Sequence, residues 1–279
     1  MTPSVAPVDK IVQSALMLPA RIEEIRAVGL SGSRARQMAD TLSDVDLCVY
    51  VAGELPSANT RREAYHALGF NHELYFDIDF ESSHGDGFEM DGLRCDFTWM
   101  SITAVTEFLE ALTVDFDCPE WLPGGLQTVE PLYDPHSELV RLQNNIPAYS
   151  DARAQHRVAK ILQEAHFTLY GLGWLDKAAL RRDVFSFQKY QHALLQNLFA
   201  VLYALNQQWF SDEKRLTKRI MAFDLKPNQV DDRIENIIMH KHGNENLKTC
   251  LTNIKSLFAD TVSLVNKKYP ELECPSKWD

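Results

Sequence analysis

The sequence predicts an α+β fold, in which a small mixed β-sheet domain with flanking helices is followed by an all-α helical bundle domain. The first half of the 279-residue chain alternates short, strand-like apolar runs with amphipathic helical segments. The second half has long segments of helical periodicity and few β-branched runs. Asparagines and Pro147 cluster over residues 144–150, which indicates a linker. We therefore expect one domain over residues 1–145 and a second over residues 146–279.

The first expected elements are a helix and two strands. Apolar residues recur at helical spacing over residues 8–18. Ile25–Leu30 is a short apolar run that leads into the small residues 31–33, which predicts a strand followed by a tight turn. Val45–Val51 is rich in β-forming side chains and is followed by Gly53, so it is predicted to be the next strand.

The rest of this half continues to mix helices and strands. Residues 57–68 are helix-like, whereas residues 74–80 alternate between apolar and polar side chains, the period of a half-buried strand. Residues 82–92 are polar and rich in glycine, which predicts a loop. The remaining predicted elements are a strand over residues 93–100, a helix over residues 101–112 capped by Ser101, and a strand over residues 128–133.

Residues 151–268 predict four or five long amphipathic helices. The second of them is expected to extend from about residue 177 to residue 208, because that stretch contains almost no helix-breaking residue. The third is expected to end near residue 221. The predicted starts are Ser150 or Asp151 for the first helix, Lys177 for the second, Ser211 for the third and Pro227 for the fourth.

The charge is uneven along the chain. Residues 1–135 hold 8 Lys and Arg against 23 Asp and Glu, a net charge of −15, whereas residues 136–279 hold 20 against 16, a net charge of +4. An acidic half disfavours nucleic acid as a partner, because affinity for a polyanion comes mostly from Lys and Arg. It favours metal cations and cationic small molecules.

The expected location is the cytoplasm, without membrane association. No stretch of about 18 or more residues is free of polar groups, so no segment is predicted to span a membrane. The N-terminal segment lacks the basic region and the long apolar region of a signal peptide.

Two acidic residues lie at the start of the predicted strand 45–51. Asp44 and Asp46 are two positions apart, so their side chains share one face of the strand, with the intervening side chains turned into the core. Adjacent carboxylates repel each other unless a cation lies between them. Oxygen ligands at this spacing suit Mg²⁺, which proteins usually hold with one or two carboxylates plus substrate phosphates.

The turn that precedes this acidic pair can hold a phosphate group. Gly32 lets the backbone approach closely, and the backbone N–H groups of Gly32 and Ser33 can donate to phosphate oxygens. The hydroxyl group of Ser33 adds a donor. A phosphate cradle beside a metal-binding pair predicts a site for a nucleoside triphosphate.

A third carboxylate would complete a site for two metal ions. Asp96 is the best candidate, because it is a lone acid in the otherwise apolar strand 93–100, where an unpaired charge is costly. Asp96 can also accept a proton from an attacking hydroxyl group. Three other acids, Asp77, Asp79 and Glu81, alternate along one strand face, and any of them could supply the third carboxylate instead of Asp96. A solvent-exposed strand face also explains their alternation.

The sequence resembles the DNA polymerase β-like nucleotidyltransferase superfamily in the order of Gly32-Ser33, ten intervening residues, Asp44-Val45-Asp46-Leu47 and an isolated Asp96 on a later strand. The local sequence Gly32-Ser33-Arg34-Ala35-Arg36 is similar to the small-molecule branch, which includes aminoglycoside and lincosamide nucleotidyltransferases. These motifs occupy residues 29–47 and 92–99. Members pair a small mixed-sheet catalytic domain with a C-terminal helical bundle, which is the order expected here.

The resemblance implies roles for individual residues. The implied catalytic and metal-binding residues are Asp44, Asp46 and Asp96, with two Mg²⁺ ions expected. Gly32 and Ser33 would bind the β- and γ-phosphates of ATP or another nucleoside triphosphate. Arg36 matches the commoner position of an arginine in the family and would also reach the triphosphate, with Arg34 as a near alternative.

Two lysines in the second half of the chain are further candidates for binding the triphosphate. Lys189 forms a polar stripe with His192 and Gln196 on the predicted helix 177–208, although a solvent-exposed helix face explains this stripe as well. Lys214 lies near the position where related proteins often carry a phosphate-binding lysine.

The implied reaction transfers a nucleoside monophosphate, expected to be AMP from ATP, to a hydroxyl group of a small molecule and releases pyrophosphate. The acidic N-terminal half favours a cationic acceptor such as an aminoglycoside, and a lincosamide is the next candidate; antibiotic resistance would be the biological role. Two other functions remain open. One is a catalytically silent, antitoxin-like module that binds nucleotide, and the other is a nucleotidyltransferase that acts on RNA or protein.

Overall fold

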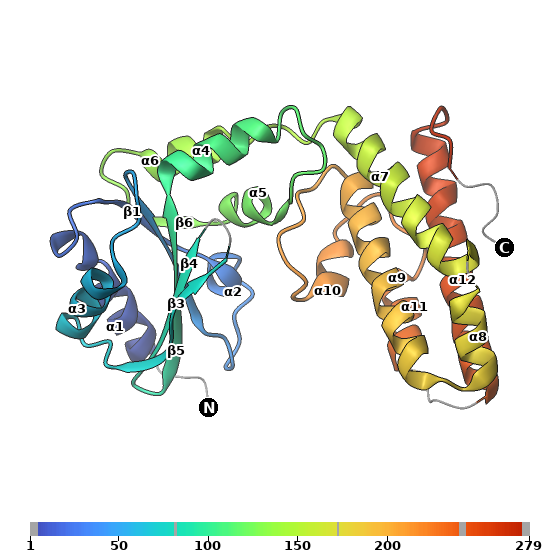
Figure 1. Cartoon of the computed structure of the whole chain (residues 1–279), viewed down its shortest axis with the longest axis horizontal. Coiled ribbons are helices and arrows are strands. Elements are labelled where there is room, and N and C mark those ends of the chain that lie inside the picture. Colours follow the sequence, from blue (N-terminus) through green and yellow to red (C-terminus); the bar gives the residue numbers. More distant parts are fainter. Residues whose placement is uncertain (1–4, 81–82, 172, 240–243, 275–279) are drawn as a thin grey trace. The chain divides into compact units, whose positions relative to one another are not determined.

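Within the described part of the chain, six strands pair into one mixed sheet in the order β3-β4-β5-β2-β1-β6. The strands are β1 (Ile25–Leu30), β2 (Val45–Val51), β3 (His72–Asp79), β4 (His84–Met90), β5 (Leu93–Ser101) and β6 (Glu130–Tyr133). The neighbours β2 and β5 are parallel, and the other four pairs are antiparallel. The structure is a computed structural model that describes residues 5–80, 83–171, 173–239 and 244–274 (Figure 1).

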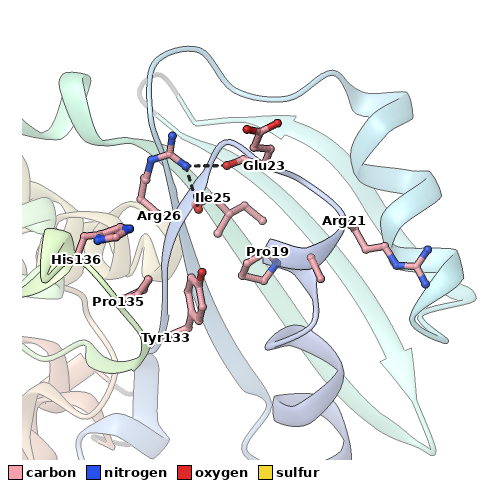
Figure 2. Close-up of a pocket in the computed structure, with 9 residues that line it drawn as sticks. Pro19, Arg21, Glu23, Ile25, Arg26, Tyr133, Pro135 and His136 are labelled. Carbon is pink, nitrogen blue, oxygen red and sulfur yellow. Dashed lines mark hydrogen bonds between the residues drawn. The ribbon is translucent and has the colours of Figure 1, made fainter.

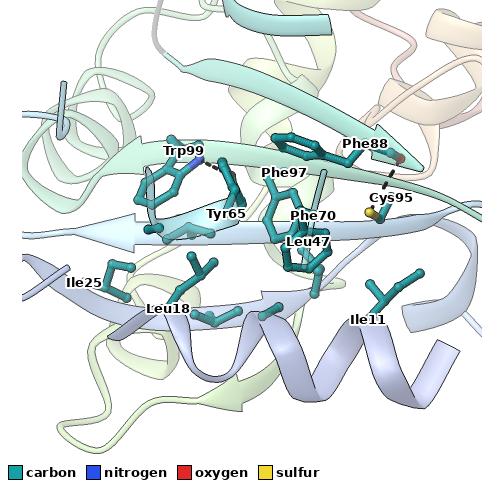
Figure 3. Packing of buried hydrophobic residues seen from close by; sticks show 14 of the residues in the cluster. Ile11, Leu18, Ile25, Leu47, Tyr65, Phe70, Phe88, Cys95, Phe97 and Trp99 are labelled. Carbon is teal, nitrogen blue, oxygen red and sulfur yellow. Dashed lines mark hydrogen bonds between the residues drawn. The ribbon is translucent and has the colours of Figure 1, made fainter. Parts of the chain in front are cut away.

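The core of the sheet unit lies under one face of β2. The buried side chains of β2 on this face are Val45, Leu47, Val49 and Val51. Tyr65 lies among them, with its ring centroid 4.6 Å from that of Phe88 and 4.8 Å from that of Phe97 (Figure 3). Because alternate side chains of a strand point to opposite faces, Asp44 and Asp46 lie on the other face.

Helices cover the sheet and connect its strands. Those of this unit are α1 (Val5–Ala15), α2 (Gly32–Ala35), α3 (Ala58–Ala67), α4 (Ile102–Ala111), α5 (Trp121–Leu126) and α6 (Glu138–Asn144). Ile11 of α1 and Tyr65 of α3 belong to the core cluster, so these two helices pack on the same face of the sheet (Figure 1). Ser101 begins α4 as predicted, since its hydroxyl oxygen accepts a hydrogen bond from the backbone N–H of Ala104.

The second half of the chain is helical. Its helices are α7 (Asp151–His166), α8 (Trp174–Arg181), α9 (Val184–Leu205), α10 (Leu216–Ile220), α11 (Val230–Ile238) and α12 (Asn244–Lys268). The chain divides into two compact units, Met1–Cys118 with Leu122–Pro147 and Pro119–Trp121 with Ala148–Asp279. The predicted α+β class, a mixed sheet with flanking helices followed by a helical region, is confirmed. None of the helices in the described ranges combines the length and the apolar character needed to cross a membrane.

The loop predicted over residues 82–92 is wrong, because His84–Met90 forms strand β4. Its glycines misled the prediction, since glycine is unfavourable in an isolated strand. In the sheet, aromatic rings of the β3 hairpin arm occupy the space that these glycines leave: Tyr75 lies over Gly87 and Phe80 over Gly85. Pairing with both β3 and β5 stabilises the strand.

The single helix predicted over residues 177–208 is also wrong, since it is two helices, α8 and α9. Arg182 ends α8 with a left-handed backbone (φ 59°). Asp183 then caps α9, because its carboxylate accepts a hydrogen bond from the backbone N–H of Ser186 at 3.1 Å. The helix predicted from Ser211 to residue 221 begins later, at Leu216, after Arg215 with its left-handed backbone (φ 58°). The Ser211 hydroxyl accepts a hydrogen bond from the guanidinium of Arg219 instead of capping a helix.

Candidate active site

The parallel strands β2 and β5 bring three acidic residues together. Asp46 pairs directly with Asp96 in the register of the two strands, and Asp44 directly precedes β2. Among the described residues, Asp44, Asp46 and Asp96 can each offer a carboxylate oxygen such that all three oxygens lie within 4.8 Å of one another. All three side chains are half-buried. The three acids singled out in the sequence therefore form one cluster, although they are up to 52 positions apart.

The turn after β1 lies against this cluster. Gly32 has a left-handed backbone (φ 65°), and a Cβ atom at this position would overlap the carboxylate of Asp46. The backbone N–H of Ser31 also donates to the carbonyl oxygen of Asp46 at 2.8 Å. Glycine is therefore required at position 32, both for the backbone conformation and for the space beside the acid.

Ser33 has a hydroxyl group without a hydrogen-bond partner among the described residues. Its oxygen is buried, and no hydrogen bond to it is made within the described segments of the chain. A buried hydroxyl without a partner is unfavourable, so this atom beside the glycine turn has a hydrogen-bonding capacity that the described residues leave unused. This observation fits the phosphate-binding role that the sequence suggested for Gly32 and Ser33.

Arg34, one of the two arginines near this turn, is held by the backbone before β2. The guanidinium of Arg34 donates to the carbonyl oxygens of Asp44 and Ser43, at 2.8 and 2.7 Å. Arg34 thus links α2 to the two residues that directly precede β2. The contact of Arg36 with a triphosphate remains a prediction.

Asp96 has two partners that the sequence analysis did not identify. The hydroxyl group of Tyr75 donates to its Oδ1 at 2.9 Å. Nε of Arg94 lies 3.0 Å from Oδ1 and 2.9 Å from Oδ2. Burial, and then the nearby carboxylate of Asp96, raise the pKa of Tyr75 to about 12, so this hydroxyl stays protonated as a donor. The signal available in the sequence was the spacing of Arg94 and Asp96, which places them on one face of β5.

The rival acids on β3 do not share a face with Asp96. The sequence placed Asp77 and Asp79 on the same face as Tyr75, but a bulge at Asp77 (φ 56°) shifts the register between Tyr75 and Ile78. Tyr75 pairs with Gly87, the partner of Asp96, whereas Asp79 pairs with His84 on the opposite face. Glu81 lies outside the described residues.

Asp77 joins a buried ion-pair network instead. Arg61 of α3 donates to Asp77 at 2.6 Å and, through Nε, to Asp86 of β4 at 3.0 Å. The side chains of Arg61 and Asp86 are 2% and 0% exposed. Hydrogen bonds from Arg61 and then His84 hold the pKa of Asp77 below its usual range. This network therefore joins α3 to β3 and β4 rather than to the acidic cluster.

The helical unit carries the two predicted lysines. Lys189 is exposed and lies 5.8 Å from the ring centroid of Tyr190, and Lys214 is also exposed. A cavity of about 270 Å³ in this unit is lined by Gln196, Lys160 and Phe210, among others. Neither Lys189 nor Lys214 lines it. The phosphate contacts of Lys189 and Lys214 remain predictions.

A second cavity, of about 380 Å³, lies at the start of β1 (Figure 2). The acidic cluster lies beyond the other end of this six-residue strand, roughly 17 Å away at about 3.3 Å per residue. Arg26 lines the cavity, but its guanidinium donates to the chain's own carbonyl oxygens, at Glu23 and Ile25. The cavity is therefore separate from the acidic site.

Replacing Gly32 by alanine should disable the turn that the sequence predicts to hold a phosphate. The added Cβ would displace the Asp46 carboxylate and strain the left-handed backbone, so we expect binding of a nucleoside triphosphate to weaken by about tenfold or more. Equilibrium dialysis with labelled ATP measures this. The matched control is Gly53→Ala, because Gly53 also has a positive φ (74°) but open space around its Cβ position. Equal losses in both variants would contradict the argument.

Comparisons with known proteins add little to this geometry. No protein family matches the sequence, and no curated protein matches it. Among solved structures, the chain is similar to a nucleotidyltransferase-like protein from Exiguobacterium sibiricum 255-15, with a TM-score of 0.45 and 10% sequence identity. The similarity covers 95% of this chain and 81% of that chain. It is too distant to transfer a residue role or an activity.

Proposed function

We propose that this protein is a Mg²⁺-dependent nucleotidyltransferase that moves a nucleoside monophosphate, AMP from ATP in the first instance, onto a hydroxyl group of a small molecule. The observation that carries the proposal is the convergence of Asp44, Asp46 and Asp96 beside the turn at Gly32. The same arrangement underlies the family resemblance of the sequence. A cluster of acids alone is common on protein surfaces, and the adjoining turn with an unpartnered buried hydroxyl is what distinguishes this one.

The donor set fits Mg²⁺. Three carboxylates supply hard oxygen ligands, and their ligand atoms lie within 4.8 Å of one another. Bound to Asp44, Asp46 and Asp96, Mg²⁺ would neutralise the charge of the triphosphate and of the departing pyrophosphate. The turn at Gly32 and Ser33 would hold the β- and γ-phosphates through its backbone N–H groups and the Ser33 hydroxyl.

The reaction needs little covalent chemistry from the protein. The acceptor oxygen bonds to the α-phosphorus, the bond from that phosphorus to the bridging oxygen of the β-phosphate breaks, and pyrophosphate leaves with the electron pair. We assign the proton of the acceptor hydroxyl to the carboxylate of Asp96. The other residues act by positioning and by charge neutralisation.

The acceptor is proposed from charge. Residues 1–135 carry a net charge of −15, which would attract a cationic, hydroxylated molecule such as an aminoglycoside. An aminoglycoside is therefore the first acceptor to test and a lincosamide the second.

A pyrophosphate-release assay tests the function. Purified protein, Mg²⁺ and each nucleoside triphosphate in turn are mixed with a panel of aminoglycosides and lincosamides. We expect release that requires an acceptor and that disappears in the double variant Asp44→Ala/Asp46→Ala. The matched control is Asp115→Ala/Asp117→Ala, which removes two exposed carboxylates at the same spacing. This control should retain the activity.

Two results would count against the proposal. If ATP and Mg²⁺ bind but no acceptor in the panel supports release, the antibiotic acceptors are excluded, and the choice lies between an acceptor outside the panel and a catalytically silent nucleotide-binding module. If no nucleoside triphosphate binds, the phosphate turn and the acidic cluster are not a nucleotide site.

A further inference from the structure

A row of four residues crosses the sheet at the acidic site. Tyr75 of β3 pairs with Gly87 of β4, Gly87 pairs with Asp96 of β5, and Asp96 pairs with Asp46 of β2. Side chains of directly paired residues lie on the same face of a sheet, so the Tyr75 ring and both acids share one face. Tyr75 is nevertheless two strands away from Asp96.

Gly87 explains how Tyr75 reaches that far. A Cβ atom at Gly87 would overlap the ring of Tyr75, so the ring lies directly across the backbone of β4. Its hydroxyl group then donates to Oδ1 of Asp96 at 2.9 Å. A side chain at position 87 would lift the ring and break this hydrogen bond.

Arg94 approaches Asp96 in a different way. Its Nε contacts both carboxylate oxygens, and its guanidinium lies 5.6 Å from the ring centroid of Tyr75. The side chain of Arg94 is 52% exposed, against 16% for Asp96. Because the arginine of this ion pair is half exposed to solvent, it can leave the carboxylate at a smaller cost than the arginine of a fully buried pair.

The two contacts differ in their compatibility with a metal ion. A carboxylate has about four lone-pair positions, so one hydrogen bond from a neutral hydroxyl group leaves room for a cation. Arg94 carries a positive charge and contacts both oxygens, so it repels a divalent cation at the same carboxylate.

We propose that Tyr75 is a positioning residue that holds Asp96 toward Asp44 and Asp46, and that Arg94 is an internal counter-ion that a divalent cation displaces from Asp96. This inference rests on the proposed function, because it takes the acidic cluster to be a metal site. Tyr75 supports metal binding, whereas Arg94 opposes it. Removing each group should therefore change metal affinity in opposite directions.

Binding of Mn²⁺, followed by the electron paramagnetic resonance signal of the free ion, measures both effects without any turnover. We expect Arg94→Gln to bind Mn²⁺ about fivefold more tightly than the unaltered protein, because a like charge is gone. We expect Tyr75→Phe to bind it about threefold more weakly, because an orienting hydrogen bond is gone. Arg94→Lys keeps the charge and should stay near the unaltered affinity.

A matched control separates the local effect from the change in net charge. Arg62→Gln removes an arginine from a comparable exposed ion pair, with Glu73 at 3.0 Å, and should change the affinity by less than about twofold. Unchanged or weaker binding by Arg94→Gln overturns the counter-ion role, and unchanged or tighter binding by Tyr75→Phe overturns the positioning role. If the unaltered protein binds no Mn²⁺ that depends on Asp44 and Asp46, the proposed function fails as well, which is a distinct result.

Discussion

The Asp96→Asn variant is expected to lose nucleotidyl transfer by about a thousandfold, while Asp79→Asn keeps the activity of the unaltered protein. Asp96 is paired with Asp46 and belongs to the acidic cluster, so its charge would be needed for the metal and its carboxylate for the proton. Asp79 pairs with His84 on the opposite face of the sheet. Asparagine keeps the shape of the side chain and removes the charge.

Steady-state kinetics of pyrophosphate release measures this difference, and thermal unfolding of each variant checks that the fold is intact. Because Asp96 would serve both the proton transfer and the metal that holds the triphosphate, we expect a large fall in kcat together with a smaller rise in the KM for ATP. Loss of activity in Asp79→Asn with retention in Asp96→Asn would return the third carboxylate to β3 and contradict the assignment.

Loss of Arg61 is expected to destabilise the sheet unit more than loss of any exposed arginine. In Arg61→Met, the free energy of unfolding should fall by about 3–5 kcal/mol, because Asp86 is left as an uncompensated buried charge. Asp86 would keep the hydrogen bond from the Tyr65 hydroxyl, at 3.2 Å, which does not replace a counter-ion. Asp86→Asn should have a smaller effect of the same sign, since its amide keeps some of the hydrogen bonds.

Urea unfolding, followed by tryptophan fluorescence, measures the loss. Trp99 is buried in the core cluster and donates to the Tyr65 hydroxyl at 2.8 Å, so it reports on this part of the molecule. The matched control is Arg62→Met on the same helix, whose ion pair with Glu73 is exposed and should be worth less than about 1 kcal/mol. A similar fall in the free energy of unfolding in the two variants would show that the buried ion pairs of Arg61 stabilise the protein no more than the ion pair of Arg62.

Local periodicity was sufficient to predict the strands that build the site. The bounds of β1 and β2 agree with the predicted Ile25–Leu30 and Val45–Val51, because an apolar run of β-forming side chains ended by small residues is a property of neighbouring residues. The local sequence did not predict which strands pair with one another. Strand β4 was predicted to be a loop, because Gly85 and Gly87 lower the strand propensity of the segment. Rings from a different segment, Tyr75 and Phe80, stabilise it in the sheet.

The sequence by itself determined the α+β class, the positions of Asp44 and Asp46 on one strand face, and the tight turn of small residues before them. The tertiary structure alone decided that Asp96, and neither Asp77 nor Asp79, lies beside this pair. It also revealed Tyr75 and Arg94 as the partners of Asp96. The physical reason is that periodicity assigns a face within one strand, whereas a single bulge at Asp77 reverses that face. The register between strands depends on segments that are distant in the chain and is fixed only when they pair.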